Sequence, residues 1–190
     1  MTAILGVLLG LVAATGQAGS YVCSRWFVLR RRGGVPALMV LAHMIMGGVA
    51  AAALPLLVPG DMPPAARWWG ALLQTTLFYL LGQLGLFISL RRIDASVLAP
   101  LLGLKIVILA VAALVTGAPP TALQWLAVGL AVAGAFVLNF GGARLSAAAV
   151  GALLVTCLGY ALSDLGIVRL MTALGARGAV GWELARRSLL

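Results

Sequence analysis

The chain has 190 residues, of which 63% are hydrophobic and 9% are charged, and its mean hydropathy is +1.14. A soluble domain carries roughly 25% charged residues, so this composition excludes a water-soluble fold. The formal net charge of +9 comes mainly from arginines at the ends of apolar runs, which is typical of topology signals and snorkelling anchors. This pattern argues against nucleic-acid binding.

Six apolar runs are long enough to cross a bilayer, which takes about 20 residues. They cover residues 3–22, 36–58, 69–90, 95–115, 123–140 and 147–168. A segment at that depth satisfies its backbone hydrogen bonds as a helix. The sequence therefore predicts an all-α polytopic membrane bundle of about six transmembrane helices. The short links leave no room for a soluble catalytic or nucleotide-binding domain, so any transport would run on gradients or be driven by a partner.

The first and fifth spans carry small residues along one face. Gly6, Gly10 and Ala14 recur every four residues in the first span, and Gly129 and Gly134 lie in the fifth. Small residues let helices approach closely inside lipid. We therefore expect these faces to pack against neighbouring helices.

Polar side chains form a stripe on each of the first, third and sixth spans. The stripes are Gln17, Tyr21 and Ser24; Thr75, Tyr79 and Gln83; and Thr156, Tyr160 and Ser163. Their spacing of three or four residues places each set on one helix face, and polar groups at membrane depth need a partner or a watery cavity. Two interpretations stay open: a shared cavity, or hydrogen bonding between helices without one.

Lys105 is the most informative single residue. It lies about ten residues into the fourth span, shortly after Pro100 and Gly103. A proline inside a helix leaves one carbonyl without its donor and favours a kink. A lysine at that depth is costly unless it is paired or hydrated, and Asp164 is the only carboxylate within a predicted span. An ion pair, a site for an anionic substrate and a neutral lysine in proton coupling all fit.

The sequence predicts no metal site and no cofactor. His43 is the only histidine, and Cys23 and Cys157 have no ligand-type neighbours at suitable spacing. A lone imidazole within a span is more often a hydrogen-bonding group than a metal or proton site. Without a pair of carboxylates in a span there is little material for acid–base chemistry, so we do not expect an enzyme.

A faint internal repeat links the first and sixth spans. The segment GVLL at 6–9 resembles GALL at 151–154, and a tyrosine, a serine and an arginine follow each segment. If the repeat is real, the unit has five spans, and an odd unit reverses its orientation on repetition. We therefore divide the chain into a five-helix half, residues 1–142, and the start of an inverted second half, residues 143–190, which we expect to be truncated.

Several segments resemble the EamA-type members of the drug/metabolite transporter superfamily. They are LRRIDASVLAPL at 90–101, GLK at 103–105, LAVGLAVAGA at 126–135 and GYALSD at 159–164. The resemblance implies ten helices in two inverted halves, a central cavity, and export or exchange of small metabolites such as amino acids, nucleobases or sugar derivatives. The chain departs from the family in lacking an acidic residue at 116–120 and four helices of the second half.

Together these observations predict a multi-pass secondary transporter of the inner membrane. Its cavity residues would be Lys105, Tyr79, Gln83, Gln17, Tyr21, Tyr160 and Asp164. Its partners would be the lipid bilayer, a small-molecule substrate with or without a coupling ion, and a second copy or the missing half. The alternative is a non-transporting subunit or assembly factor that binds a partner through its small-residue faces, and a membrane enzyme ranks third. The orientation of the chain in the membrane stays open. The first, third and fifth links between the spans are rich in arginine and place the N-terminus outside, whereas the family resemblance places it inside.

Overall fold

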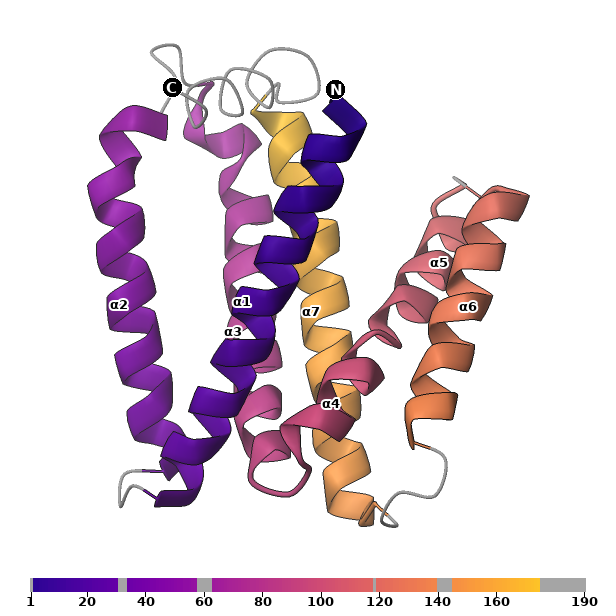
Figure 1. Ribbon diagram of the computed structural model, residues 1–190. Helices are drawn as coiled ribbons and strands as arrows, with labels where there is room; N and C mark the ends of the chain where they lie inside the picture. The colour runs from indigo at the N-terminus through magenta and orange to yellow at the C-terminus, as the bar shows by residue number, and fades with distance from the viewer. Residues whose placement is uncertain (1, 31–33, 58–62, 118, 140–144, 175–190) are drawn as a thin grey trace.

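The computed structural model describes residues 2–30, 34–57, 63–117, 119–139 and 145–174. These ranges form α-helices joined by short links, with a single 3₁₀ turn, η1 (Ala65–Arg67), before the third helix. The helices are α1 (Thr2–Arg30), α2 (Gly34–Leu57), α3 (Trp69–Leu90), α4 (Ala95–Leu102), α5 (Lys105–Val115), α6 (Ala122–Asn139) and α7 (Ala147–Ala173). Figure 1 shows them as a bundle of long rods, in which α4 and α5 together make one broken rod.

The helices follow the predicted spans. Four segments of the described chain are long and apolar enough to cross a membrane: Gly34–Ala52, Trp69–Leu90, Ala95–Val115 and Ala147–Ala173. A shorter apolar helix covers Ala122–Val137. The prediction of an all-helical, multi-pass membrane protein is therefore confirmed. The predicted span ends at residues 58 and 140, and the domain boundary between residues 142 and 143, lie outside the described residues.

Two helix starts show how local sequence sets the element boundaries. Before α6, the Thr121 backbone N–H donates to Gln124 Oε1 at 2.7 Å, and the Gln124 N–H donates to Thr121 Oγ1 at 3.3 Å. This is the reciprocal capping box, which satisfies amide donors that have no partner within the helix. Before α7, Ser146 Oγ accepts from the Ala149 N–H at 3.2 Å, so α7 also begins at a side-chain cap.

The fourth span breaks halfway along its length. Pro100 contributes no N–H to the helix, and α4 ends two residues later at Leu102. The N–H groups of Gly103 and Leu104 bond back three residues, to the carbonyls of Pro100 and Leu101, both at 3.0 Å. These bonds form a tight 3₁₀-type turn. Lys105 is therefore the first residue of a new helix rather than a position inside a continuous one.

The closest helix pair is α3 with α7, which pack along most of their length through four glycines, the glycine seam. They are Gly82, Gly85, Gly159 and Gly166. A Cβ on Gly159 would lie 2.5 Å from the backbone N of Gly82, and a Cβ on Gly82 would lie 2.7 Å from the Tyr160 ring. Small residues permit such close approach in membranes, and the seam fixes which face of α7 is left for other contacts.

The small-residue faces expected to pack in the first and fifth spans have no such neighbours. A Cβ built on Gly6, Gly10, Gly129 or Gly134 meets nothing within 4 Å among the described residues. Ala14 is also exposed. Gly134 is nevertheless partly buried next to the buried Ala135, so packing through these faces stays a prediction.

The apolar core of the bundle lies toward the end where α1 meets the link between α3 and α4. An arginine binds the backbone at that end. Arg25 of α1 donates to the Leu90 carbonyl at 2.8 Å and to the Ile93 carbonyl, and it pairs with Asp94 at 2.5 Å. We call these four residues the rim clasp. Leu90 and Ile93 are both buried. The clasp ties the end of α1 to the link between α3 and α4.

Candidate substrate cavity

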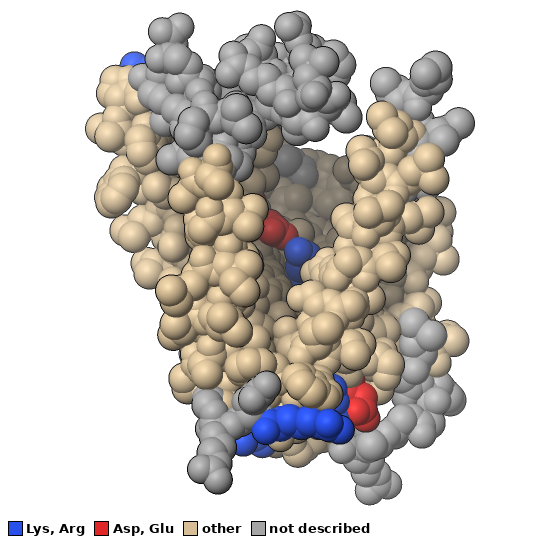
Figure 2. Space-filling view, turned by 60° about the vertical axis from the view of Figure 1, so that its left-hand side comes forward, with Lys and Arg blue, Asp and Glu red and all other residues tan. Residues whose placement is uncertain are grey.

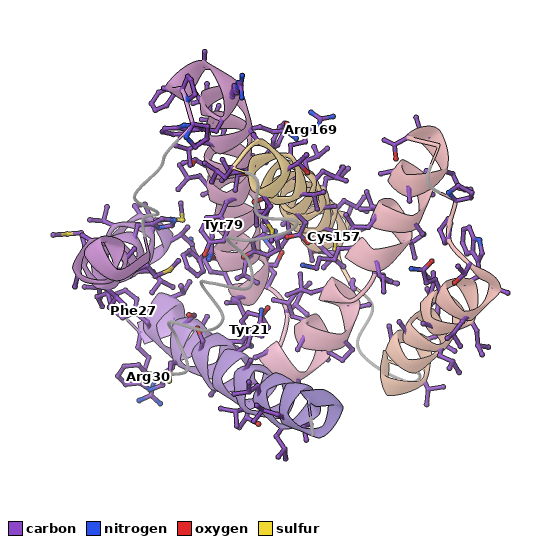
Figure 3. The ribbon with its side chains drawn as sticks, turned by 90° about the horizontal axis from the view of Figure 1, so that it is seen from above. Tyr21, Phe27, Arg30, Tyr79, Cys157 and Arg169 are labelled. Atoms are coloured by element: carbon purple, nitrogen blue, oxygen red, sulfur yellow. The ribbon has the colours of Figure 1, made fainter. Side chains whose placement is uncertain are left out.

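All seven predicted cavity residues line one cavity of about 390 Å³. Gln17 and Tyr21 come from α1, Tyr79 and Gln83 from α3, Lys105 from α5, and Tyr160 and Asp164 from α7. An adjoining hollow of about 300 Å³ shares Gln17, Tyr21, Lys105 and Tyr160 with it and adds Ala14. Seen from above, Tyr21 and Tyr79 point into the bundle, whereas Arg30 and Arg169 point outward (Figure 3).

The cavity contains an ion pair between Lys105 and Asp164. Lys105 Nζ lies 2.9 Å from Asp164 Oδ2, so the structure brings the two predicted partners together. Their side chains are 39% and 37% exposed, which means that both charges border open space instead of closed packing. Figure 2 shows an acidic and a basic group side by side within the hollow between apolar faces.

An aromatic wall stands beside the ion pair. The Tyr160 ring centroid lies 5.9 Å from Lys105 Nζ and 6.0 Å from the Tyr79 ring, with the two rings tilted by 43°. A cation within about 6 Å of an aromatic face is attracted by the ring quadrupole. Tyr160 therefore gives the cavity a surface that favours positive charge, next to the carboxylate of Asp164.

Two glutamine–tyrosine pairs hold the polar stripes in place. Gln17 Nε2 donates to the Tyr21 hydroxyl at 2.6 Å, and Gln83 Nε2 donates to the Tyr79 hydroxyl at 2.6 Å. Each pair is spaced by four residues on one helix. The Tyr79 hydroxyl in turn donates to Met46 Sδ at 3.8 Å, whereas Gln83 Oε1 is buried with no partner among the described residues. The stripes thus keep unused hydrogen-bonding capacity.

Two members of the polar stripes lie in the helix contact instead of the cavity. The Thr156 hydroxyl is fully buried and donates to the Ala152 carbonyl at 2.8 Å. Thr75 faces Gly166, and its carbonyl accepts from the Ser163 hydroxyl at 3.1 Å. Both threonines are therefore part of the α3–α7 contact. Some residues of the polar stripes thus line a cavity, and others lie between packed helices.

The contribution of α2 was not predicted. Ala42 and Met46 of α2 line the cavity, and the His43 ring lies edge-on to Tyr79, with centroids 6.0 Å apart. His43 Nδ1 lies 2.7 Å from the Met39 carbonyl, so this nitrogen carries the proton and donates. Methionines at 39 and 46 gave a weak signal for an adaptable lining, but the sequence did not show which face of α2 turns inward.

A multi-pass helical bundle that holds charged and aromatic groups around an internal cavity has the architecture of a membrane carrier. The EamA-like transporter family model matches residues 4–140, and the chain belongs to that family, whose members are transporters and not enzymes. The chain matches no curated protein and no solved structure. The matched residues end before α7, which contributes Tyr160 and Asp164 to the cavity.

Proposed function

We propose that the chain is a secondary transporter of the inner membrane that crosses the bilayer with six helices and exports or exchanges small metabolites. The observation that carries this proposal is the Lys105–Asp164 pair, which borders the cavity with both side chains more than a third exposed. A pair kept only for structure is expected in dry packing with its partners satisfied. Here the surrounding polar groups keep free acceptors such as Gln83 Oε1.

Removal of the ammonium tests the proposal directly. In reconstituted vesicles loaded with a radiolabelled panel of amino acids, nucleobases and sugar derivatives, Lys105→Ala is expected to abolish the flux that the parent chain supports. Arg67→Ala is the matched control, because Arg67 is an exposed cation in η1, away from the cavity. Unchanged flux in Lys105→Ala contradicts the assignment of this site.

Water access to the cavity provides a second test. In a background with Cys23 and Cys157 replaced by serine, Gln17→Cys and Ser24→Cys are expected to react with a membrane-impermeant thiol reagent, because both positions line the cavity. Leu153→Cys, which lies in the apolar core, is expected to stay unlabelled. Equal protection at all three positions indicates a dry bundle.

A second function is supported by the small-residue faces of α1 and α6. Among the described residues, none comes within 4 Å of a Cβ built on Gly6, Gly10, Gly129 or Gly134, as expected of a subunit or assembly factor that binds a membrane partner. In this case the partner is a second copy of the chain or a helical second half. Gly10→Ile is expected to abolish cross-linking between copies through Cys introduced on α1. Flux that stays intact in this variant indicates that the face is not needed for transport.

We also propose that residues 1–142 form one five-helix unit and that residues 143–190 begin an inverted second unit. The arrangement of the cavity supports this division, because α1 and α7 line it with similar side chains: Ser20 and Tyr21 from one helix, Tyr160 and Ser163 from the other. Joining the chain to a further helical unit is then expected to raise flux above that of the chain alone.

A further inference from the structure

The formal charges that line the cavity sum to zero. Among the described residues around the cavity, Lys105 supplies the ammonium and Asp164 the carboxylate, and the adjoining hollow adds neither a carboxylate nor a further cation. The nearby charges are engaged elsewhere: Arg25 pairs with Asp94 in the rim clasp, and Arg169 donates to Gln74 at 2.9 Å. The charges of the described lining residues thus compensate each other.

A cargo with a net charge disturbs this balance. An anion bound to Lys105 competes with the Asp164 carboxylate, which lies 2.9 Å from the ammonium, and a cation bound to Asp164 competes with the ammonium in the same way. Either event leaves one uncompensated charge at membrane depth, where such charges are costly. A zwitterion adds one charge of each sign and therefore leaves the site neutral.

We infer that the cavity selects a cargo with no net charge and prefers a zwitterion. The anionic group of the zwitterion binds Lys105 in place of Asp164, and its cationic group binds Asp164 in place of Lys105. This inference rests on the proposed transport function and states which charge class the site accepts. Lys105 and Asp164 then bind each other in the way that each would bind the opposite charge of the cargo.

The surroundings of the pair fit this exchange. The Tyr160 ring already lies 5.9 Å from the Lys105 ammonium, so a cargo cation beside Asp164 would find the same aromatic face. In the described structure the Lys105 ammonium has Asp164 as its hydrogen-bonding partner and no backbone carbonyl. Because both side chains are more than a third exposed, the pair can open toward the cavity without unpacking the core.

The experiment measures binding of three probes that share a propyl skeleton and carry permanent charges. They are trimethylammonio-propanesulfonate, a zwitterion; propanesulfonate, an anion; and propyltrimethylammonium, a cation. Permanent charges prevent a proton from neutralising the probe. The full chain is held in lipid nanodiscs. It is expected to bind the zwitterion at least about tenfold more tightly than either charged probe.

The variants reverse the order in opposite directions. Asp164→Asn leaves an unpaired ammonium and is expected to prefer propanesulfonate by about tenfold, whereas Lys105→Met is expected to prefer propyltrimethylammonium. The double variant is expected to lose charge preference, and it also serves if a single variant fails to fold, because it leaves no unpaired charge. Asp94→Asn is the matched control, because it removes a carboxylate outside the cavity, and it keeps the parent order.

Two results overturn the inference. One is a parent chain that binds the anion or cation as tightly as the zwitterion, and the other is a set of variants that bind none of the probes. Both results leave the flux of the parent chain in loaded vesicles to decide separately whether the chain transports at all. The inference is supported if the parent chain prefers the zwitterion and each variant prefers the probe of opposite charge to its remaining group.

Discussion

The packed and hollow parts of the bundle use the same kinds of residue for different purposes. In the rim clasp, Arg25 pairs with a carboxylate and also caps two backbone carbonyls, so its position is fixed by three contacts. In the cavity, Lys105 has a single carboxylate partner at 2.9 Å. The difference indicates that charge in the packed part holds helices together, whereas charge in the cavity is left available for exchange. Substitutions should therefore lower stability in the first case and change selectivity in the second.

The largest loss of stability is expected at the glycine seam. Gly159→Ala introduces a Cβ 2.5 Å from the Gly82 backbone N and 2.7 Å from its Cα. Backbone cannot rotate away as a side chain can, so overpacking should lower the free energy of unfolding by about 2–3 kcal/mol. Thermal unfolding in detergent measures the loss. Gly151→Ala on the same helix, which meets nothing within 4 Å, is the control, and equal melting temperatures would show that the seam is not tightly packed.

A smaller loss is expected when the rim clasp is opened. Arg25→Met removes the donors to the Leu90 and Ile93 carbonyls and should lower the free energy of unfolding by about 1–2 kcal/mol, because buried acceptors lose their partners. Asp94→Asn should cost only a few tenths of a kcal/mol, because the Asp94 side chain is 70% exposed. Chemical unfolding of both variants measures this asymmetry. If the two losses are equal, the clasp depends on the ion pair and not on the carbonyl contacts.

Of the variants that remove a principal contact at each of the three places, the one in the cavity is expected to lose the least stability. Asp164→Asn keeps an oxygen that can accept from Lys105, and the partly exposed ammonium can be hydrated, so the loss should be about 1 kcal/mol or less. The same variant is the one whose probe preference changes. Unfolding and binding measured on one preparation separate the two outcomes. A loss of stability as large as that of Arg25→Met would place the Lys105–Asp164 pair among the structural contacts.

The sequence predicted the cavity residues because helical periodicity does not depend on the partner helix. Spacings of four residues placed Gln17 with Tyr21 and Tyr79 with Gln83 on single faces, and the paucity of carboxylates in the spans pointed to Asp164 as the partner of Lys105. These inferences need only the geometry of one helix and the cost of unpaired charge. The resemblance to the EamA family added the expectation of a central cavity.

The sequence could not predict which small residues pack. Gly6 and Gly10 have the regular spacing of a packing motif but have no close neighbour in the part of the chain that the structure describes, whereas Gly82 and Gly159 form the seam without that regularity. What decides between them is the opposing surface: Gly82 is needed because the Tyr160 ring lies across it. Such complementarity belongs to a pair of helices, so a single helix pattern does not contain it. The same reason explains why the inward face of α2 was missed.

The break between α4 and α5 has a mechanical consequence. A continuous helix transmits rotation from one membrane face to the other, but the turn at Gly103 and Leu104 interrupts the regular hydrogen bonding of the span. On one side, Leu98 and Leu102 of α4 are buried in the core; on the other, α5 carries Lys105 at its first position. The span is therefore two helical segments whose axes are set separately, one by the packing of α4 in the core and the other by α5, which places Lys105 at the cavity.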